Sequence, residues 1–194
     1  MTTTPQVRAA ILAKLQARSE LGLVHGFERY SKQASTLVEL YTSAGAGAKR
    51  ELRGWYLRRL RRRVRADGSM YVKVETEWRL RGFLGLEDAE ATETVLDSLV
   101  DAIEADFRAD DTLGGLVERL GPEGEESAWG WQLTDSGPVM FGSMLCNSAE
   151  LSLTTVHSEP RGVEGDPFTL AVAGWNLDAE PGDETEDHVQ LEGA

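Results

Sequence analysis

Few residues of this sequence have the types and spacing that chemistry on a substrate requires. The three histidines, His25, His157 and His188, lie far apart, and no HxxxH, CxxC or HExxH spacing is present to build a metal site. A GxSxG motif for a serine nucleophile is also missing, as are the GxGxxG, GxxxxGKS and GxxxxGKT motifs that hold phosphates. We therefore expect no enzymatic activity, no catalytic residue, no cofactor and no metal, and we look for function in the surfaces of the protein.

Carboxylates are concentrated on a helix predicted from about Asp88 to Ala109. They are Glu90, Glu93, Asp97, Asp101, Glu104 and Asp106. Two such carboxylates can form an acid–base pair only where the surroundings raise the pKa of one of them. Nothing in this stretch does so. We interpret the acids as a surface that faces solvent or a neighbouring protein.

The basic residues are concentrated elsewhere. The chain has a net charge of −13, yet residues 49–81 alone carry +8, whereas residues 82–156 carry −14 and residues 157–194 carry −9. A basic ribbon on an acidic body favours self-association, with the ribbon of one subunit against an acidic face of its neighbour. The alternative is a basic face that is merely solvated. The candidate interface residues are Arg53, Arg58, Arg59, Arg61, Arg62, Arg63, Arg65, Arg79 and Arg81.

The single cysteine, Cys146, cannot form an intramolecular disulfide. It lies in an alternating apolar stretch, so we expect a small buried hydrophobic residue and not a reactive thiol. The N-terminus lacks the apolar core of a signal peptide, and no window approaches the ~18 apolar residues of a membrane helix. These features predict a soluble protein made in a reducing cytoplasm, with no membrane partner.

The first elements of the chain are predicted from local signals. Thr4 followed by Pro5 is typical of a helix N-cap with proline at the first helical position, so a helix is expected over about 5–18. The loose alternation over Leu23–Tyr30 predicts a strand.

Residues 51–65 fit both an amphipathic helix and a strand. The Asp67-Gly68 pair that follows is a strong hairpin signal and decides for the strand. The second strand alternates clearly, and its apolar face consists of Val72, Val74, Thr76, Trp78 and Leu80. A long hairpin over 52–83 is therefore predicted, with arginines gathered toward its tip.

The remaining elements complete an α/β (α+β) domain. We expect Asp110–Gly115 to shape the turn after the central helix, and strands at Trp129–Leu133 and Met144–Val156, with an edge strand at Phe168–Trp175. The predicted core residues are Trp55, Trp78, Val95, Leu99, Ile103 and Phe107.

The fold class is thus a single domain with a mostly antiparallel or mixed β-sheet and a long β-hairpin, flanked by an N-terminal helix and a central amphipathic helix. Residues 1–157 form this domain, and residues 158–194 form an extension whose acidic end is expected to be disordered alone.

The order of these signals resembles the tail terminator, or tail completion, proteins of long-tailed bacteriophages and prophages. The matching segments cover about residues 6–157 and begin with Arg8-Ala9-Ala10-Ile11 in the first helix. They continue with Gly22-Leu23-Val24-His25, Glu28-Arg29-Tyr30, Arg53-Gly54-Trp55, Arg81-Gly82-Phe83-Leu84-Gly85-Leu86-Glu87-Asp88-Ala89, Phe107-Arg108-Ala109-Asp110-Asp111-Thr112-Leu113-Gly114-Gly115 and Met140-Phe141-Gly142-Ser143-Met144-Leu145-Cys146. The extension after residue 157 has no counterpart in the family pattern, so its role stays open.

The resemblance implies a compact α/β fold that assembles into a homohexameric ring. In the family this ring caps the finished tail tube, stops its polymerisation and offers the surface for head–tail joining, without a cofactor or enzymatic activity. The implied partners are further copies of the chain, the tail tube protein and a head-side connector or neck protein, while DNA passes through the ring without specific binding. The implied location is the virion, at the head–tail junction, after assembly in the host cytoplasm.

Two alternatives remain open at this stage. One is another head–tail connector or minor tail protein of the same fold, because a fold does not fix a position in an assembly. The other is a nucleic-acid-binding module that grips phosphates with the arginine-rich hairpin, as β-ribbon proteins do, although the acidic remainder of the chain would repel DNA.

Overall fold

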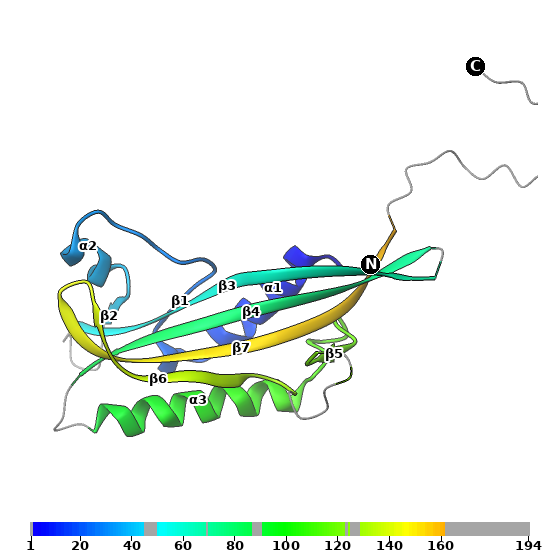
Figure 1. The fold of residues 1–194 in the computed structure, drawn as a ribbon. Coiled ribbons are helices and arrows are strands. Elements are labelled where there is room, and N and C mark those ends of the chain that lie inside the picture. The colour runs from blue at the N-terminus through cyan, green and yellow to red at the C-terminus, as the bar shows by residue number, and fades with distance from the viewer. Residues whose placement is uncertain are drawn as a thin grey trace, which may run out of the picture. The chain divides into compact units, whose positions relative to one another are not determined.

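The computed structural model describes residues 2–44, 50–68, 70–86, 91–122, 124 and 129–161. These residues form an α+β domain, as the sequence predicts, with a mixed sheet of seven strands (Figure 1). The strands are β1 Leu23–His25, β2 Thr42–Ala44, β3 Arg50–Asp67, β4 Tyr71–Gly85, β5 Arg119–Leu120, β6 Gln132–Phe141 and β7 Met144–Pro160. The helices are α1 Thr4–Gln16, the short 3-10 turn η1 Ser19–Leu21, α2 Ala34–Glu39 and α3 Thr92–Ala109.

The centre of the sheet is built from the three longest strands, β3, β4 and β7, which are antiparallel to one another. β1 runs parallel to β3 and β2 antiparallel to it, and both lie on the outer side of β3. β5 and β6 pair with the outer side of β7. The compact unit ends at Arg161, beyond the boundary at 157 expected from the sequence, because β7 continues to pair with β4 as far as Pro160.

The long hairpin is confirmed. β3 and β4 pair from Arg53 to Asp67, and the turn contains Gly68, whose φ of 71° lies in the left-handed region that glycine adopts freely. The register shifts between Arg59 and Arg61, where Leu60 forms a bulge. A bulge adds one residue to its strand and so shifts the alternation of faces by one residue beyond it; Arg58 is opposite Arg79, and Arg61 is opposite Glu77, which is on the same face as Arg79. Arg58 and Arg61 therefore share the face that carries Arg79 of β4.

The N-terminal helix is also confirmed, but its first turn differs from the prediction. The N-cap is Thr3, not Thr4, and its backbone N–H donates to the Gln6 side chain over 2.8 Å. Pro5 follows inside the first turn, where a missing N–H is tolerated. The helix ends at Gln16, and its buried stripe includes Val7, Ile11 and Leu15.

Two of the predicted strands have different bounds. The strand expected over Leu23–Tyr30 ends at His25. Gly26, the next residue, packs closely on α1, and a Cβ there would lie 2.9 Å from Leu12. The strand expected over Trp129–Leu133 is instead β6, Gln132–Phe141, which contains Gly137 and Pro138. Because β6 lies at the edge of the sheet, Pro138 removes no ladder hydrogen bond. The strand expected at Met144–Val156 is confirmed and extends to Pro160, whereas the residues of the expected strand Phe168–Trp175 and of the acidic tail lie outside the described residues.

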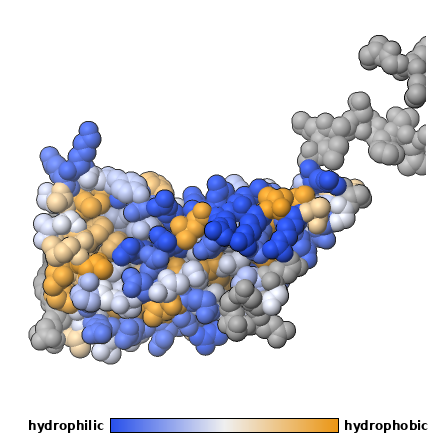
Figure 2. All heavy atoms as spheres, in the orientation of Figure 1, coloured by the Kyte–Doolittle hydropathy of each residue, from blue (hydrophilic) through white to orange (hydrophobic). Residues whose placement is uncertain are grey.

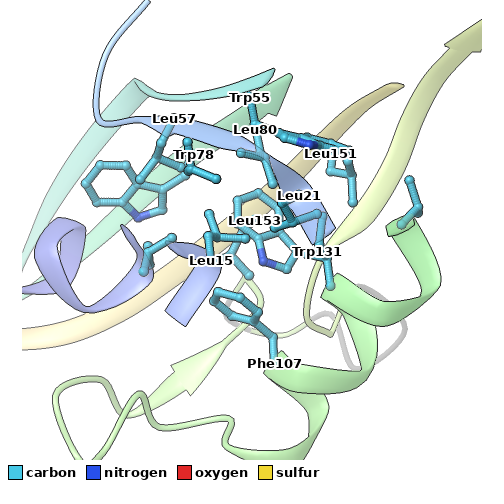
Figure 3. Packing of buried hydrophobic residues seen from close by; sticks show 14 of the residues in the cluster. Leu15, Leu21, Trp55, Leu57, Trp78, Leu80, Phe107, Trp131, Leu151 and Leu153 are labelled. Carbon is cyan, nitrogen blue, oxygen red and sulfur yellow. The ribbon is translucent and has the colours of Figure 1, made fainter. Parts of the chain in front are cut away.

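The main hydrophobic core lies between one face of the sheet and the helices α1 and α3 (Figure 3). Trp55, Trp78, Leu99, Ile103 and Phe107 are buried there as predicted, and Val95 is partly buried against them. Figure 3 shows Leu15 of α1 and Phe107 of α3 pointing toward the tryptophans and leucines of the sheet. A second, smaller hydrophobic cluster lies where α2 packs against the sheet, with Leu37 and Val38 of α2 in contact with it. Its buried residues are Tyr41, Leu52, Tyr56, Phe83 and Cys146.

Candidate interaction surface

The nine arginines predicted as an interface are not brought together into one patch. Arg58, Arg59, Arg61, Arg62, Arg63 and Arg65 lie along the exposed outer half of β3. In Figure 2, hydrophilic side chains cover this half of the molecule, with isolated hydrophobic side chains among them. Arg53 lies at the other end of β3, half-buried, and donates to the carbonyl of Glu20 over 3.3 Å.

Arg79 and Arg81 form a separate pair on β4. Both are half-buried and both approach the carboxylate of Glu150 on β7, at 3.0 and 3.5 Å. Their charge is therefore largely compensated within the subunit, and only the β3 arginines remain as a continuous basic surface. We call Arg58 to Arg65 of β3 the basic ribbon.

Most of the basic ribbon also has carboxylate partners inside the subunit. Arg58 pairs with Glu28 at 3.0 Å. Arg63 and Arg65 share Glu75, at 3.2 and 3.9 Å. Exposed pairs of this kind contribute only about 0–1 kcal/mol to stability, and they do reduce the charge that is available to a partner.

Arg62 pairs with Glu159 at 2.6 Å, and this carboxylate has further donors. It accepts hydrogen bonds from the backbone N–H and the hydroxyl of Thr4, both at 3.2 Å, and lies 3.0 Å from His157 Nε2. Burial raises the pKa of Glu159, but the bonds from His157, Arg62 and Thr4 outweigh it and the net pKa is lowered. Glu159 thus ties β3 and β7 to the first turn of α1, where a carboxylate also suits the helix dipole. Arg62 and His157 serve the fold at this position.

Arg59 has a different environment from its neighbours in the basic ribbon. With Thr4, Pro5, Arg8 and Trp78 it lines a cavity of about 180 Å³ between β3 and the first turns of α1. The Arg8 guanidinium lies 5.5 Å from the centre of the Trp78 ring. Its pKa is lowered, first by burial and then by the positive charge of Arg59. In the described part of the chain neither arginine has a carboxylate partner. We call this cavity the arginine pocket.

The sequence analysis missed Arg8 as a surface residue of interest. Its signal is its position in α1, next to the buried stripe of Val7, Ile11 and Leu15, which places it on the flank of the helix that meets the sheet. Only the fold shows that this flank faces Arg59.

The acidic residues of α3 also fall into two groups, those with a basic partner and those without one in the described residues. Three acids near its C-terminal end are paired: Glu104 with Arg108 at 2.9 Å, Asp106 with Arg18, whose Nη2 donates over 2.7 Å, and the adjoining Asp110 with Lys14 at 3.2 Å. Glu93, Asp97 and Asp101 are exposed on one side of the N-terminal half, and within the described ranges they have no basic partner. We call these three residues the acidic stripe. Glu90 lies outside the described residues.

The Asp110–Gly115 turn has the structural role that the sequence predicts. The Asp110 carboxylate accepts hydrogen bonds from the backbone N–H groups of Thr112 and Gly114, at 3.3 and 3.0 Å. These bonds lower the pKa of Asp110, with the Gly114 N–H as the main cause. Gly114 and Gly115 have positive φ angles of 69° and 83°, which explains the glycine pair.

Cys146 and His25 are both held by contacts within the described fold. Cys146 is fully buried, as predicted, and burial raises its pKa to about 11. The Nε2 atom of His25 lies 2.7 Å from the carbonyl of Leu40, and His188 lies outside the described residues. Over the described ranges, no group of three or more His, Cys, Asp or Glu side chains is arranged to hold a metal ion. None of the helices described is both long and apolar enough to span a bilayer.

The structure therefore defines an α+β protein whose candidate site is a pair of oppositely charged surfaces. No protein-family model matches the sequence, and a search of curated proteins finds no match either.

Proposed function

We propose that this protein is a virion structural protein, a tail terminator that forms a ring at the end of a phage tail tube. The observation that carries the proposal is the separation of charges that lack partners among the described residues of the subunit. Unpaired arginines lie at β3, at one side of the sheet, and unpaired acids lie on α3, which packs against β4, β6 and β7. A surface and its complement at different places on one subunit give a heterologous, head-to-tail contact, and such contacts close into a ring where the rotation between subunits closes.

The outer edge of the hairpin supports the same arrangement. β1 pairs with β3 only as far as Tyr56, so that among the described residues Leu57–Asp67 has no strand partner on its outer side. An open edge can pair with a strand of a neighbour, and its arginines and bulge discourage unspecific pairing. This edge is where we expect subunit or tube contacts.

The proposed partners are further copies of the chain in a homohexamer, the tail tube protein and a head-side connector. In this arrangement DNA passes through the ring without specific binding, and the acidic body of the subunit lines the channel. A ring whose inner wall is basic or neutral would contradict this last point.

The test combines the mass of the purified protein with its effect on tube growth. Light scattering should give a mass near six times 21.3 kDa at low salt, and the mass should fall as salt rises, because the contacts are between charges. Added to the polymerising tube protein of the same phage or prophage, the protein should stop elongation and appear at tube ends in electron micrographs. Tubes that grow to the same length with and without it would contradict the proposal.

A nucleic-acid-binding role is the alternative from a different class of function. It needs arginines that are free to contact phosphates, yet four of those in the basic ribbon are paired with carboxylates of the same subunit. Tight binding of short DNA with a steep salt dependence would favour it over the tail terminator. Another connector or minor tail protein of the same fold would form a ring without stopping tube growth.

A further inference from the structure

We infer that the arginine pocket of one subunit receives a carboxylate from the acidic stripe of α3 in a second copy of the chain. This inference rests on the proposed ring and names the contact that closes it.

The pocket is electrostatically incomplete. Arg8 and Arg59 line the same cavity of about 180 Å³, and the pKa of Arg8 is lowered first by burial and then by the positive charge of Arg59. Arginine stays charged in proteins, so this repulsion is not relieved by loss of a proton. An anion between the two guanidinium groups would relieve it. The cavity is large enough for the carboxylate end of an aspartate or glutamate side chain with a few waters, each of which takes about 30 Å³.

The chemistry of the pocket suits a carboxylate. The Trp78 indole forms an inner wall, and the Arg8 guanidinium lies 5.5 Å from the ring centre. A guanidinium held over an aromatic ring keeps a fixed orientation and can offer two parallel N–H groups to a carboxylate. Four other arginines of the basic ribbon already have carboxylate partners, for example Arg58 with Glu28.

The described part of the subunit places no free carboxylate in the pocket. Two described acids lie near it. Glu159 contacts Thr4 of the pocket lining, and its carboxylate is already used by Thr4, Arg62 and His157. Glu28 lines a second cavity together with Arg8, and its carboxylate is used by Arg58 and by the hydroxyl of Tyr30. Within the described residues, both neighbouring acids are therefore already engaged.

The acidic stripe of the same subunit lies at the far end of the fold. α1 begins beside the turn of the long hairpin, whereas α3 begins at the opposite end of the sheet (Figure 1). The helices are joined near their C-terminal ends, where Arg18 pairs with Asp106. The pocket is at the start of α1, and the stripe is in the first half of α3, so the stripe of one subunit does not reach the pocket of the same subunit.

The stripe has the spacing that such a contact needs. Glu93, Asp97 and Asp101 follow one another at intervals of four residues, and all three are exposed. This spacing places them along one side of the helix, about 6 Å apart along its axis. Among the described residues these three carboxylates form no ion pair, whereas the acids further along α3 are paired with arginines. One stripe can therefore place a carboxylate in the pocket and a second one over the basic ribbon beside it.

The test is a charge swap read out by light scattering and sedimentation at low salt. Arg59→Glu and Asp97→Arg change exposed residues without partners in the subunit, so both variants should fold, which circular dichroism and thermal melting check. Each single variant should weaken self-association by about tenfold or more, because one attractive pair becomes repulsive. The chain that carries both substitutions should regain association, since every head-to-tail contact then has a complementary pair again.

Matched controls separate this contact from a general effect of net charge. Lys32→Glu and Asp111→Arg make the same changes of charge at exposed positions outside the pocket and the stripe, and they should leave association unchanged. Single reversals that associate like the unchanged protein, or a double variant that is not restored, would overturn the inference. So would an unchanged protein that stays monomeric at low salt and high concentration. If the double variant regains association as expected but the unchanged protein does not stop tube growth, the proposed function is overturned and the inferred contact between subunits stands.

Discussion

The packing of Trp55 across Gly82 makes a quantitative prediction for the sheet that carries the arginines. The two residues are direct partners in the β3–β4 ladder. A Cβ placed on Gly82 would lie 2.4 Å from two carbons of the Trp55 ring, where ordinary carbon contacts are about 3.5–4.0 Å. Trp55 is only 1% exposed, so its ring has no free space into which to move. Gly82→Ala must therefore displace the ring or the strand.

The expected cost follows from two opposing effects. Overpacking of a close-packed core destabilises by about 1–3 kcal/mol. Replacement of glycine by alanine also restricts the unfolded chain, which stabilises by about 0.4–1 kcal/mol. We expect a net loss of about 1–2 kcal/mol, which lowers Tm by about 2–8 °C for a domain of this size.

Gly85 of the same strand provides a matched control. A Cβ there would lie 3.8 Å from Leu52, an ordinary contact, so Gly85→Ala should be neutral or slightly stabilising. Urea and thermal unfolding, followed by tryptophan fluorescence and circular dichroism, measure both variants. Trp55→Leu in combination with Gly82→Ala should make the alanine less harmful than it is in the unchanged protein, because the clashing ring is gone. A Gly82→Ala protein as stable as Gly85→Ala would refute the packing argument.

Three further predictions concern the charged residues and the cysteine. Arg62→Ala should destabilise by about 1–2 kcal/mol because it removes a donor from the partly buried Glu159 carboxylate, whereas Arg61→Ala should leave the urea midpoint unchanged. Cys146 should not react with an aromatic disulfide reagent at pH 8 in the folded protein, since burial raises its pKa to about 11, and should react at once in urea; rapid labelling without denaturant would contradict its burial. The folded-state pKa of Asp110 is lowered below its ordinary value of 3.8, so its stabilising effect is complete above that pH and is lost as the pH falls through the lower folded value. Asp110→Asn should therefore flatten the decline in stability below about pH 4, and equal slopes for both proteins would show that this carboxylate does not contribute.

The long hairpin could be predicted from the sequence because its signals are local. Asp67-Gly68 marks the turn, and the alternation from Val72 to Leu80 identifies the buried face of β4. The same rules failed for β6, where Gly137 and Pro138 have the composition of a loop. That segment is a strand only because β7 offers it an edge, and this pairing is a property of the fold.

The candidate site was predictable only in part, and for a similar reason. Composition shows a basic ribbon and an acidic helix, but the partner of each charge depends on contacts across long sequence separations. Glu159 is 97 residues from Arg62, and Asp106 is 88 residues from Arg18. No local pattern indicates that these charges are compensated, whereas Arg59 is not.

This difference changes how an arginine interface in this protein must be tested. From the sequence, reversal of Arg61, Arg62 and Arg63 together is the natural experiment, since all three appear equivalent. In the structure Arg62 holds the carboxylate that ties β7 to α1, so the triple variant would damage the subunit as well as any contact. A loss of assembly in that variant would then say nothing about the interface. Arg59 has no such role in the described fold, and its reversal, with restoration by Asp97→Arg, isolates the contact between subunits from the stability of each one.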